Sequence, residues 1–264
     1  MRNLIKAING ARPFLVDYQL ALQHIELKKQ AGITDIIRQM FGETPKPYQV
    51  GSTRVIPIMG MIGANLSPLE AIGSADVAVI DDQIDEALAD GVSRILFHIN
   101  SDGGTIEGVE ELAYKIQSLP VETVTYSSGS MNSAAYWIGA SSSRVIVSGS
   151  ASVGSVGVYA VVTDLSEQAK AMGIKVKVYR SDELKGMGVP GTEITPTQDA
   201  YLQKSVMDAA DSFKASVMSK RKLVKYEDLT GASYTGREAS AKNLVTGIEP
   251  SLKALLMKLE GKVS

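Results

Sequence analysis

The feature that most constrains the fold of this chain is a regular alternation of apolar and amphipathic stretches that begins at residue 53. Helical patterns cover residues 75–90, 105–118, 132–141 and 164–172. The strand-like runs between and around them read RVIPIMG, RILFHIN, ETVTYS, RVIVSG and KVKVYR. Repeated strand–helix units of this length predict a largely parallel sheet with helices on its faces. We therefore expect an α/β fold, in which the loops at the carboxyl ends of the strands carry any chemistry.

The flanking segments suggest two regions. Apolar residues at helical spacing over residues 13–41 predict two short helices, and the polar, turn-forming stretch 42–52 is interpreted as a linker. We therefore expect a helical arm and linker over residues 1–52 and the main domain over residues 53–264.

The C-terminal third of the chain is expected to be mostly helical. A long helix is predicted over residues 196–223, with Thr195 as its N-cap and Pro196 in its first turn. The tail from 237 to 261 reads as helical with a break near Gly247.

Composition narrows the class of protein. Of 264 residues, 44% are hydrophobic and 21% are charged, which is typical of a soluble globular protein. A formal net charge of −2 gives no electrostatic footprint for nucleic acid or acidic lipid. The absence of cysteine excludes disulfides and thiolate metal sites and favours the cytosol slightly. No secretory signal or membrane span is evident, and we expect neither a metal nor a cofactor.

Ser133 stands out because it lies in SGSMNSAAYW, within a charge-free stretch that runs from 123 to 143. Small residues of this kind often serve only to let a helix start pack closely. A nucleophilic serine needs a base, which is most often a histidine. The two histidines, His24 in the N-terminal amphipathic stretch and His98 in the run RILFHIN, are not obviously placed to serve it. Either Ser133 is structural, or its base is another residue.

Three predicted loops meet at the edge of the sheet where Ser133 is expected. The first, INSDGG at 99–104, follows a strand, and its glycine pair either makes a simple turn or frees backbone N–H groups to face a negative charge. The second contains Ser133, and at the start of its helix the N–H of Ala134 is expected to be free. The third is SVGSVGV at 152–158.

Lys185 is a candidate for the base. It lies in YRSDELKGMG, between charged residues and glycines. Most lysines are solvated surface charges, and a lysine replaces histidine as a base only where burial stabilises its neutral form. The charge-free surroundings of Ser133 are suited to such burial.

Together these residues resemble the signal peptide peptidase A family of Ser-Lys serine peptidases. The matching pieces are INSDGG, the serine of MNSAAYW, GSVGV and the lysine of DELKG, and the segment TGREASAKNLVTGI is similar to the family's closing segment. The resemblance covers about residues 53–248 and is closest to the phage branch, the capsid-assembly or prohead proteases. It implies a Clp/crotonase-like fold with an N-terminal helical arm and C-terminal helices.

The resemblance also implies roles for five residues. Ser133 would be the nucleophile and Lys185 the general base. The backbone N–H groups of Gly104 and Ala134 would form the oxyanion hole, and Ser155 would orient the lysine. Bacterial members form rings in which the serine and lysine of one site come from adjacent subunits, so a homo-oligomer with sites near subunit interfaces is expected.

The sequence departs from the family pattern at three places. Asp102 stands where proline is common, which is expected to alter the rigidity of the loop. Ala134 and Ala135 replace a pair that contains glycine, which narrows the space near the oxyanion hole. Thr246 replaces a common acidic residue, and we attach no role to it.

Other functions remain open at this point. Clp proteases share the fold but use Ser-His-Asp, and no histidine lies near Val158, where that residue would fall. A crotonase-like acyl-CoA enzyme also stabilises an oxyanion but needs no serine at 133. A non-enzymatic scaffold would keep the fold without any catalytic activity. Within the peptidases, a phage prohead protease would cleave scaffold and capsid proteins in the host cytoplasm, inside an assembling shell. A soluble bacterial peptidase is the alternative.

Overall fold

A computed structural model describes residues 45–67 and 70–261. The predicted helical arm over residues 13–41 lies outside the described residues. The chain divides into two compact units, which we describe one at a time. In the described residues, one unit comprises 158–211, and the other comprises everything up to Gly157 and from Ser212 onward.

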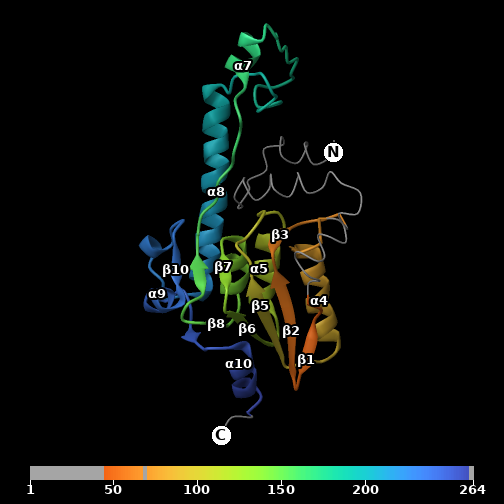
Figure 1. Ribbon diagram of the computed structural model, residues 1–264, viewed down its shortest axis with the longest axis vertical. Coiled ribbons are helices and arrows are strands. Elements are labelled where there is room, and N and C mark those ends of the chain that lie inside the picture. The colour runs from red at the N-terminus through yellow and green to blue at the C-terminus, as the bar shows by residue number, and fades with distance from the viewer. Residues whose placement is uncertain (1–44, 68–69, 262–264) are drawn as a thin grey trace. The chain divides into compact units, whose positions relative to one another are not determined.

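The larger unit is built on a six-stranded sheet, with the order β1-β2-β5-β6-β8-β11 (Figure 1). All neighbouring pairs are parallel except β1 and β2. The predicted parallel sheet is therefore confirmed. The strands are β1 (Tyr48–Val50), β2 (Thr53–Met59), β5 (Arg94–Asn100), β6 (Glu122–Ser127), β8 (Arg144–Val147) and β11 (Gly247–Ile248).

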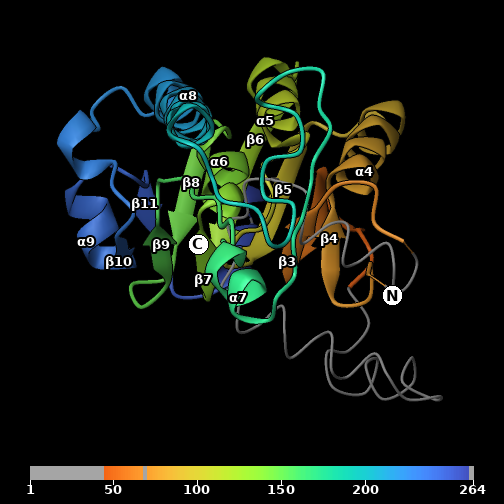
Figure 2. The same ribbon diagram turned by 90° about the horizontal axis from the view of Figure 1, so that it is seen from above.

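Helices cover both faces of this sheet. Figure 2 shows α4 (Val77–Ala89) and α5 (Val109–Ser118) side by side along one face. On that same face α6 (Ala134–Ala140) approaches so closely that a Cβ on its Gly139 would lie 3.2 Å from the side chain of Ile99. On the other face Leu255 and Leu256 of α10 (Leu252–Leu259) pack on a buried apolar cluster that includes Leu96 and Tyr126. Because successive residues of a strand point to opposite faces, the central strands β2, β5 and β6 are buried on both sides, whereas the edge strand β1 is largely exposed.

Two smaller sheets lie in the same unit. One has the order β10-β9-β7, where β7 (Ser130–Asn132) and β9 (Ser152–Gly154) are parallel and β10 (Ser233–Thr235) is antiparallel to β9. The other pairs β3 (Met61–Gly63) with β4 (Ser74–Asp76). A 3-10 turn at Tyr226–Asp228 and α9 (Gly236–Ala241) complete the unit.

The smaller unit holds α7 (Ser166–Ala171), the segment 173–195 and the first part of α8 (Pro196–Lys220). The hydroxyl of Thr195 accepts from the Gln198 N–H at 3.3 Å, so the predicted N-cap of the long helix is confirmed. The last turns of α8 belong to the larger unit, where Phe213 stacks on Trp137 of α6 with ring centroids 4.6 Å apart.

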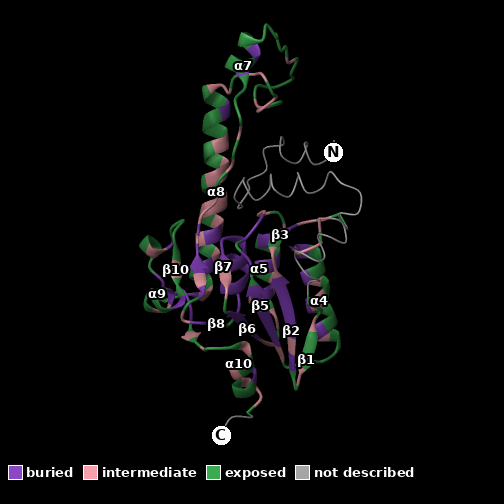
Figure 3. Cartoon of the chain, viewed as in Figure 1, coloured by how far each residue is buried: buried purple, intermediate pink, exposed green. Residues whose placement is uncertain are grey.

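Three sequence-based predictions need correction. KVKVYR, at 175–180, forms no strand and is almost wholly exposed (Figure 3), because no strand within the described residues pairs with it. Tyr48–Val50, placed in the linker, instead forms the edge strand β1. The tail break near Gly247 is a short strand, β11, which extends the main sheet.

Candidate active site

Ser133 occupies a sharp turn between β7 and α6. Its backbone has φ 54° and ψ −127°, a region that L-residues rarely adopt and that usually marks a functional constraint. The side chain makes no capping hydrogen bond to α6, so its hydroxyl is not used to hold the helix. The Ser133 N–H donates to the Gly154 carbonyl at 2.8 Å, and the residue is only 3% exposed. A strained serine on a strand-to-helix turn is the arrangement of a nucleophile elbow.

The helix that follows Ser133 is firmly anchored. Trp137 stacks on Phe213, and the guanidinium of Arg221, at the end of α8, donates to the Ser142 and Ser143 carbonyls beyond the end of α6. Burial lowers the pKa of Arg221. These contacts fix α6 and hence the position of Ser133 at its start.

The glycine pair of the first loop lies directly beside Ser133. Gly103 has φ 106°, and a Cβ built there would lie 2.7 Å from the Ser133 Cβ and 3.2 Å from the Ala134 nitrogen. A Cβ on Gly104 would lie 1.8 Å from the Ile62 carbonyl oxygen. Gly103 therefore requires glycine for both conformation and space, and Gly104 requires it for space.

Two backbone donors at this place have no acceptor. The Gly103 N–H donates to the Ser101 hydroxyl at 3.1 Å, and the Thr105 N–H donates to the Ile62 carbonyl at 3.0 Å. Between them, the N–H of Gly104 has no partner among the described residues, and neither has the N–H of Ala134. Both residues are buried. Buried donors without partners are rare, and a pair beside a serine is suited to stabilise a developing oxyanion.

Ser155 follows the strand next to that of Ser133. Asn132 and Gly154 are partners in the parallel pair of β7 and β9, so Ser133 and Ser155 leave adjacent strands at the same edge. Ser155 also has a positive φ of 52°, and its N–H donates to the Ala232 carbonyl at 2.8 Å. The predicted residues Gly104, Ser133, Ala134 and Ser155 are thus brought together in one unit.

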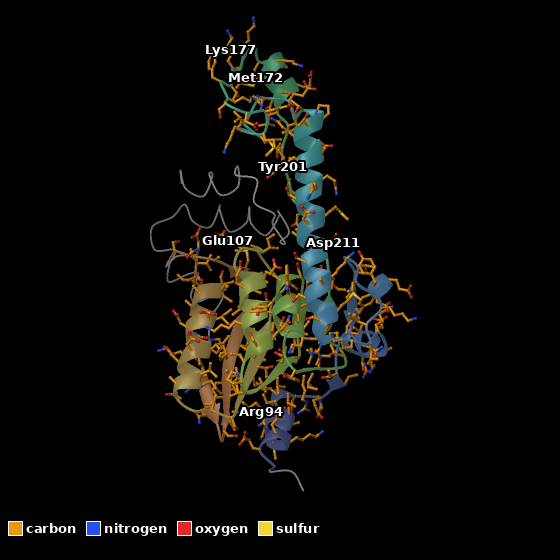
Figure 4. The ribbon with its side chains drawn as sticks, turned by 180° about the vertical axis from the view of Figure 1, so that it is seen from behind. Arg94, Glu107, Met172, Lys177, Tyr201 and Asp211 are labelled. Carbon is orange, nitrogen blue, oxygen red and sulfur yellow. The ribbon has the colours of Figure 1, made fainter. Side chains whose placement is uncertain are left out.

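Lys185 lies in the other unit, in a turn where its N–H donates to the Asp182 carbonyl at 3.0 Å. The residue is exposed. Other side chains of this unit are exposed as well, including Met172 and Lys177, which are labelled in Figure 4. The candidate base therefore lacks, within its own unit, the burial that a neutral lysine requires.

His98 is not placed to act on Ser133. On β5, His98 and Leu96 point to the face of the sheet that α10 covers. Ile99 points to the opposite face, where α6 packs. The ring centroid of His98 is 6.0 Å from that of Tyr126, and burial lowers the pKa of His98. His24 lies outside the described residues.

The described part of the chain shows no group of three or more His, Asp or Glu side chains that could hold a metal ion. Among the helices described, none combines the length and hydropathy that a membrane-spanning segment requires.

Comparison with known proteins identifies the family. Residues 117–262 match the model of peptidase family S49. The chain belongs to this family. It is 30% identical over 176 residues to a Methanocaldococcus jannaschii protein named as a protease, an alignment that covers 63% of this chain and 56% of that protein. It is also 30% identical over 181 residues to an Enterococcus faecium protein named as a signal peptide peptidase, covering 66% of this chain and 52% of that protein.

The chain therefore spans about half the length of these curated relatives. Among solved structures, a ClpP1 variant from Listeria monocytogenes superposes with a TM-score of 0.50 at 13% identity, covering 76% of this chain and 94% of that one. At this identity the likeness shows the fold alone, and it confirms the expected Clp/crotonase-like α/β architecture.

Two residues of the candidate site were not predicted from the sequence. The first is Gly103, which was not singled out although a Cβ there would lie 2.7 Å from the Ser133 Cβ. Asn132, immediately before Ser133, is buried and hydrogen-bonded to side chains from three other segments. Its position beside the serine was the available signal.

Proposed function

We propose that this chain is a serine endopeptidase in which Ser133 is the nucleophile and Lys185 the general base. The observation that carries the proposal is the strained, buried Ser133 beside the two unpartnered N–H groups of Gly104 and Ala134. Membership of family S49 supports a peptidase over an acyl-CoA enzyme, which would not need a serine at this turn.

The proposed reaction has two steps. The Ser133 hydroxyl attacks the carbonyl carbon of the peptide bond while its proton passes to the neutral amine of Lys185, whose direction Ser155 sets. The resulting oxyanion accepts hydrogen bonds from the Gly104 and Ala134 N–H groups. As the intermediate collapses, the C–N bond breaks and the lysine protonates the leaving amine. Water then hydrolyses the acyl-enzyme by the same route and frees Ser133.

We also propose that the complete site forms in a homo-oligomer, near a subunit interface. Lys185 is exposed, and so are several apolar side chains of its unit, among them Met172 at 66% and Tyr179 at 92%. A second copy of the chain would cover such a surface and provide the burial that a basic lysine requires.

For the substrate, we propose scaffold and capsid proteins of an assembling phage shell, in the host cytoplasm. This part rests on the sequence resemblance to prohead proteases. The alternative is a soluble bacterial peptidase of the same family.

The test is cleavage of the products of neighbouring genes by the purified chain, with cut sites mapped by mass spectrometry and Ser133→Ala as the control. Ser133-dependent cuts in capsid or scaffold proteins support the full proposal. Ser133-dependent cuts in other proteins only would support the peptidase and contradict the phage role. No Ser133-dependent cleavage of these proteins or of a panel of unfolded proteins, with an oligomer present, would contradict both.

A further inference from the structure

The side chain of Asn132 connects the segments that surround Ser133. Its Nδ2 donates to the Ser152 hydroxyl at 3.0 Å and to Asp102 Oδ1 at 3.4 Å, and its Oδ1 accepts from the Ser233 hydroxyl at 3.0 Å. Asn132 is only 8% exposed. Disturbing this amide is costly because Asn132 is buried, and a buried polar group that loses its hydrogen bonds is not resolvated.

Each partner of Asn132 belongs to a different part of the site. Asp102 precedes the glycine pair, Ser152 begins the strand that leads to Ser155, and Ser233 is the register partner of Gly154 in β10. Asn132 itself precedes Ser133. One side chain therefore touches every segment of the larger unit that contributes to the candidate site.

The link to Asp102 has a particular consequence. Two consecutive glycines have wide conformational freedom, and a loop that aims the Gly104 N–H benefits from a restraint at each end. Backbone hydrogen bonds with Ile62 restrain the end at Gly103 to Thr105, which leaves the end at Asp102. Proline at residue 102 would provide one by fixing φ, but this chain has aspartate there. The Asp102 carboxylate instead accepts a hydrogen bond from Asn132. This side-chain bond restrains the loop in place of a proline ring.

We propose that Asn132 is a positioning residue, which through Asp102 holds the loop of Gly103 and Gly104 in place against Ser133. The predicted effect on kcat rests on the proposed peptidase function. The predicted effect on the mobility of the loop rests on the geometry alone. It assigns a role to Asp102, a residue that departs from the family pattern.

The test is an exchange of donor and acceptor. Asn132→Asp places two carboxylates face to face and should lower kcat by about 10- to 100-fold with KM within about threefold, since the loop acts on the transition state. Asp102→Asn should have a smaller effect. The double variant Asn132→Asp with Asp102→Asn restores one donor and one acceptor and should recover most of the lost kcat. Asp82→Asn, an exposed carboxylate on α4, is the matched control for the change of charge.

A second measurement does not depend on activity. In a Ser133→Ala background, hydrogen exchange of the segment 101–105 should accelerate in Asn132→Asp, return toward its original rate in the double variant and stay unchanged in Asp82→Asn. If Asn132→Asp does not fold, Asp102→Ala provides the same readout from an exposed position.

The outcomes separate this inference from the proposed function. If the chain shows no Ser133-dependent cleavage but the exchange rate of its loop still responds to the variants, the peptidase proposal is contradicted. The positioning role of Asn132 then stands. The inference is overturned if cleavage depends on Ser133 but Asn132→Asp changes neither kcat nor the hydrogen exchange of the loop. It is also overturned if the double variant recovers no kcat.

Discussion

The two units differ in how far each is prepared for catalysis. In the larger unit, Ser133 is buried and held in a strained turn, and its helix is anchored. Two backbone N–H groups beside Ser133 have no acceptor in the part of the chain that the structure describes. In the smaller unit, Lys185 lies in an exposed turn within a segment that contains no strand. The difference indicates that the folded chain organises the proposed nucleophile and oxyanion donors, whereas the proposed base needs further burial. Each prediction below tests one side of this contrast.

The largest effect is expected from Ser133→Ala. It removes only the hydroxyl, so peptidase activity should fall below about 1% of wild type, since loss of a nucleophile costs many orders of magnitude. The melting temperature should stay the same or rise, because the Ser133 hydroxyl makes no hydrogen bond that caps α6. Residual cleavage above that level in a clean preparation would remove Ser133 from the mechanism.

Lys185→Ala should have the next largest effect, a loss of at least about a hundredfold, which is typical for a general base. Lys177→Ala, another exposed lysine of the same unit, is the matched control and should behave as wild type. A Lys185→Ala variant as active as Lys177→Ala would contradict the assignment of the base.

Gly103→Ala should reduce activity about 10- to 100-fold and stability by about 1–3 kcal/mol, because its Cβ would press on Ser133 from a strained backbone. Gly91→Ala separates the two causes. Gly91 also has a positive φ, of 70°, but nothing lies within 4 Å of its Cβ position. That variant should lose about 1 kcal/mol and keep full activity. Equal activity in the two variants would show that the contact with Ser133 is unimportant.

The smallest effect is expected at His98. Burial lowers the pKa of His98, so the unfolded chain binds its proton first, and the free energy of unfolding should decrease as the pH falls below about 6.5. His98→Gln removes this contribution and should narrow the stability difference between pH 7 and pH 5, measured by urea denaturation. Its peptidase activity should be unchanged. A large loss of activity at constant stability would make this histidine a rival base.

Much of the fold was predictable because its signals are local. RILFHIN and RVIVSG are apolar enough to identify central strands, and Thr195 with Pro196 identified the start of α8. KVKVYR shows that alternation alone is insufficient, since the same pattern forms no strand where no neighbour pairs with it. The strands β7, β9 and β10 have three residues each, too few to give a periodic signal.

The site was predictable in part, for a similar reason. Ser133, Gly104, Ala134 and Ser155 come together because they follow or flank paired strand ends, which the strand–helix order anticipates. The role of Asn132 was not predictable, because one of its partners, Ser233, is 101 residues away in the chain. Nor does the sequence show that Lys185 is exposed in its own unit, since burial depends on what packs against it.

The central claim is that Ser133 and Lys185 form one site, completed between subunits. It is tested most directly by mixing the inactive variants Ser133→Ala and Lys185→Ala under conditions in which native mass spectrometry confirms subunit exchange. A shared site predicts recovery to about one quarter of wild-type activity, since random exchange pairs an intact serine with an intact lysine at that frequency of interfaces. If exchange is complete and the mixture stays inactive, the two residues do not meet across an interface and the claim is wrong.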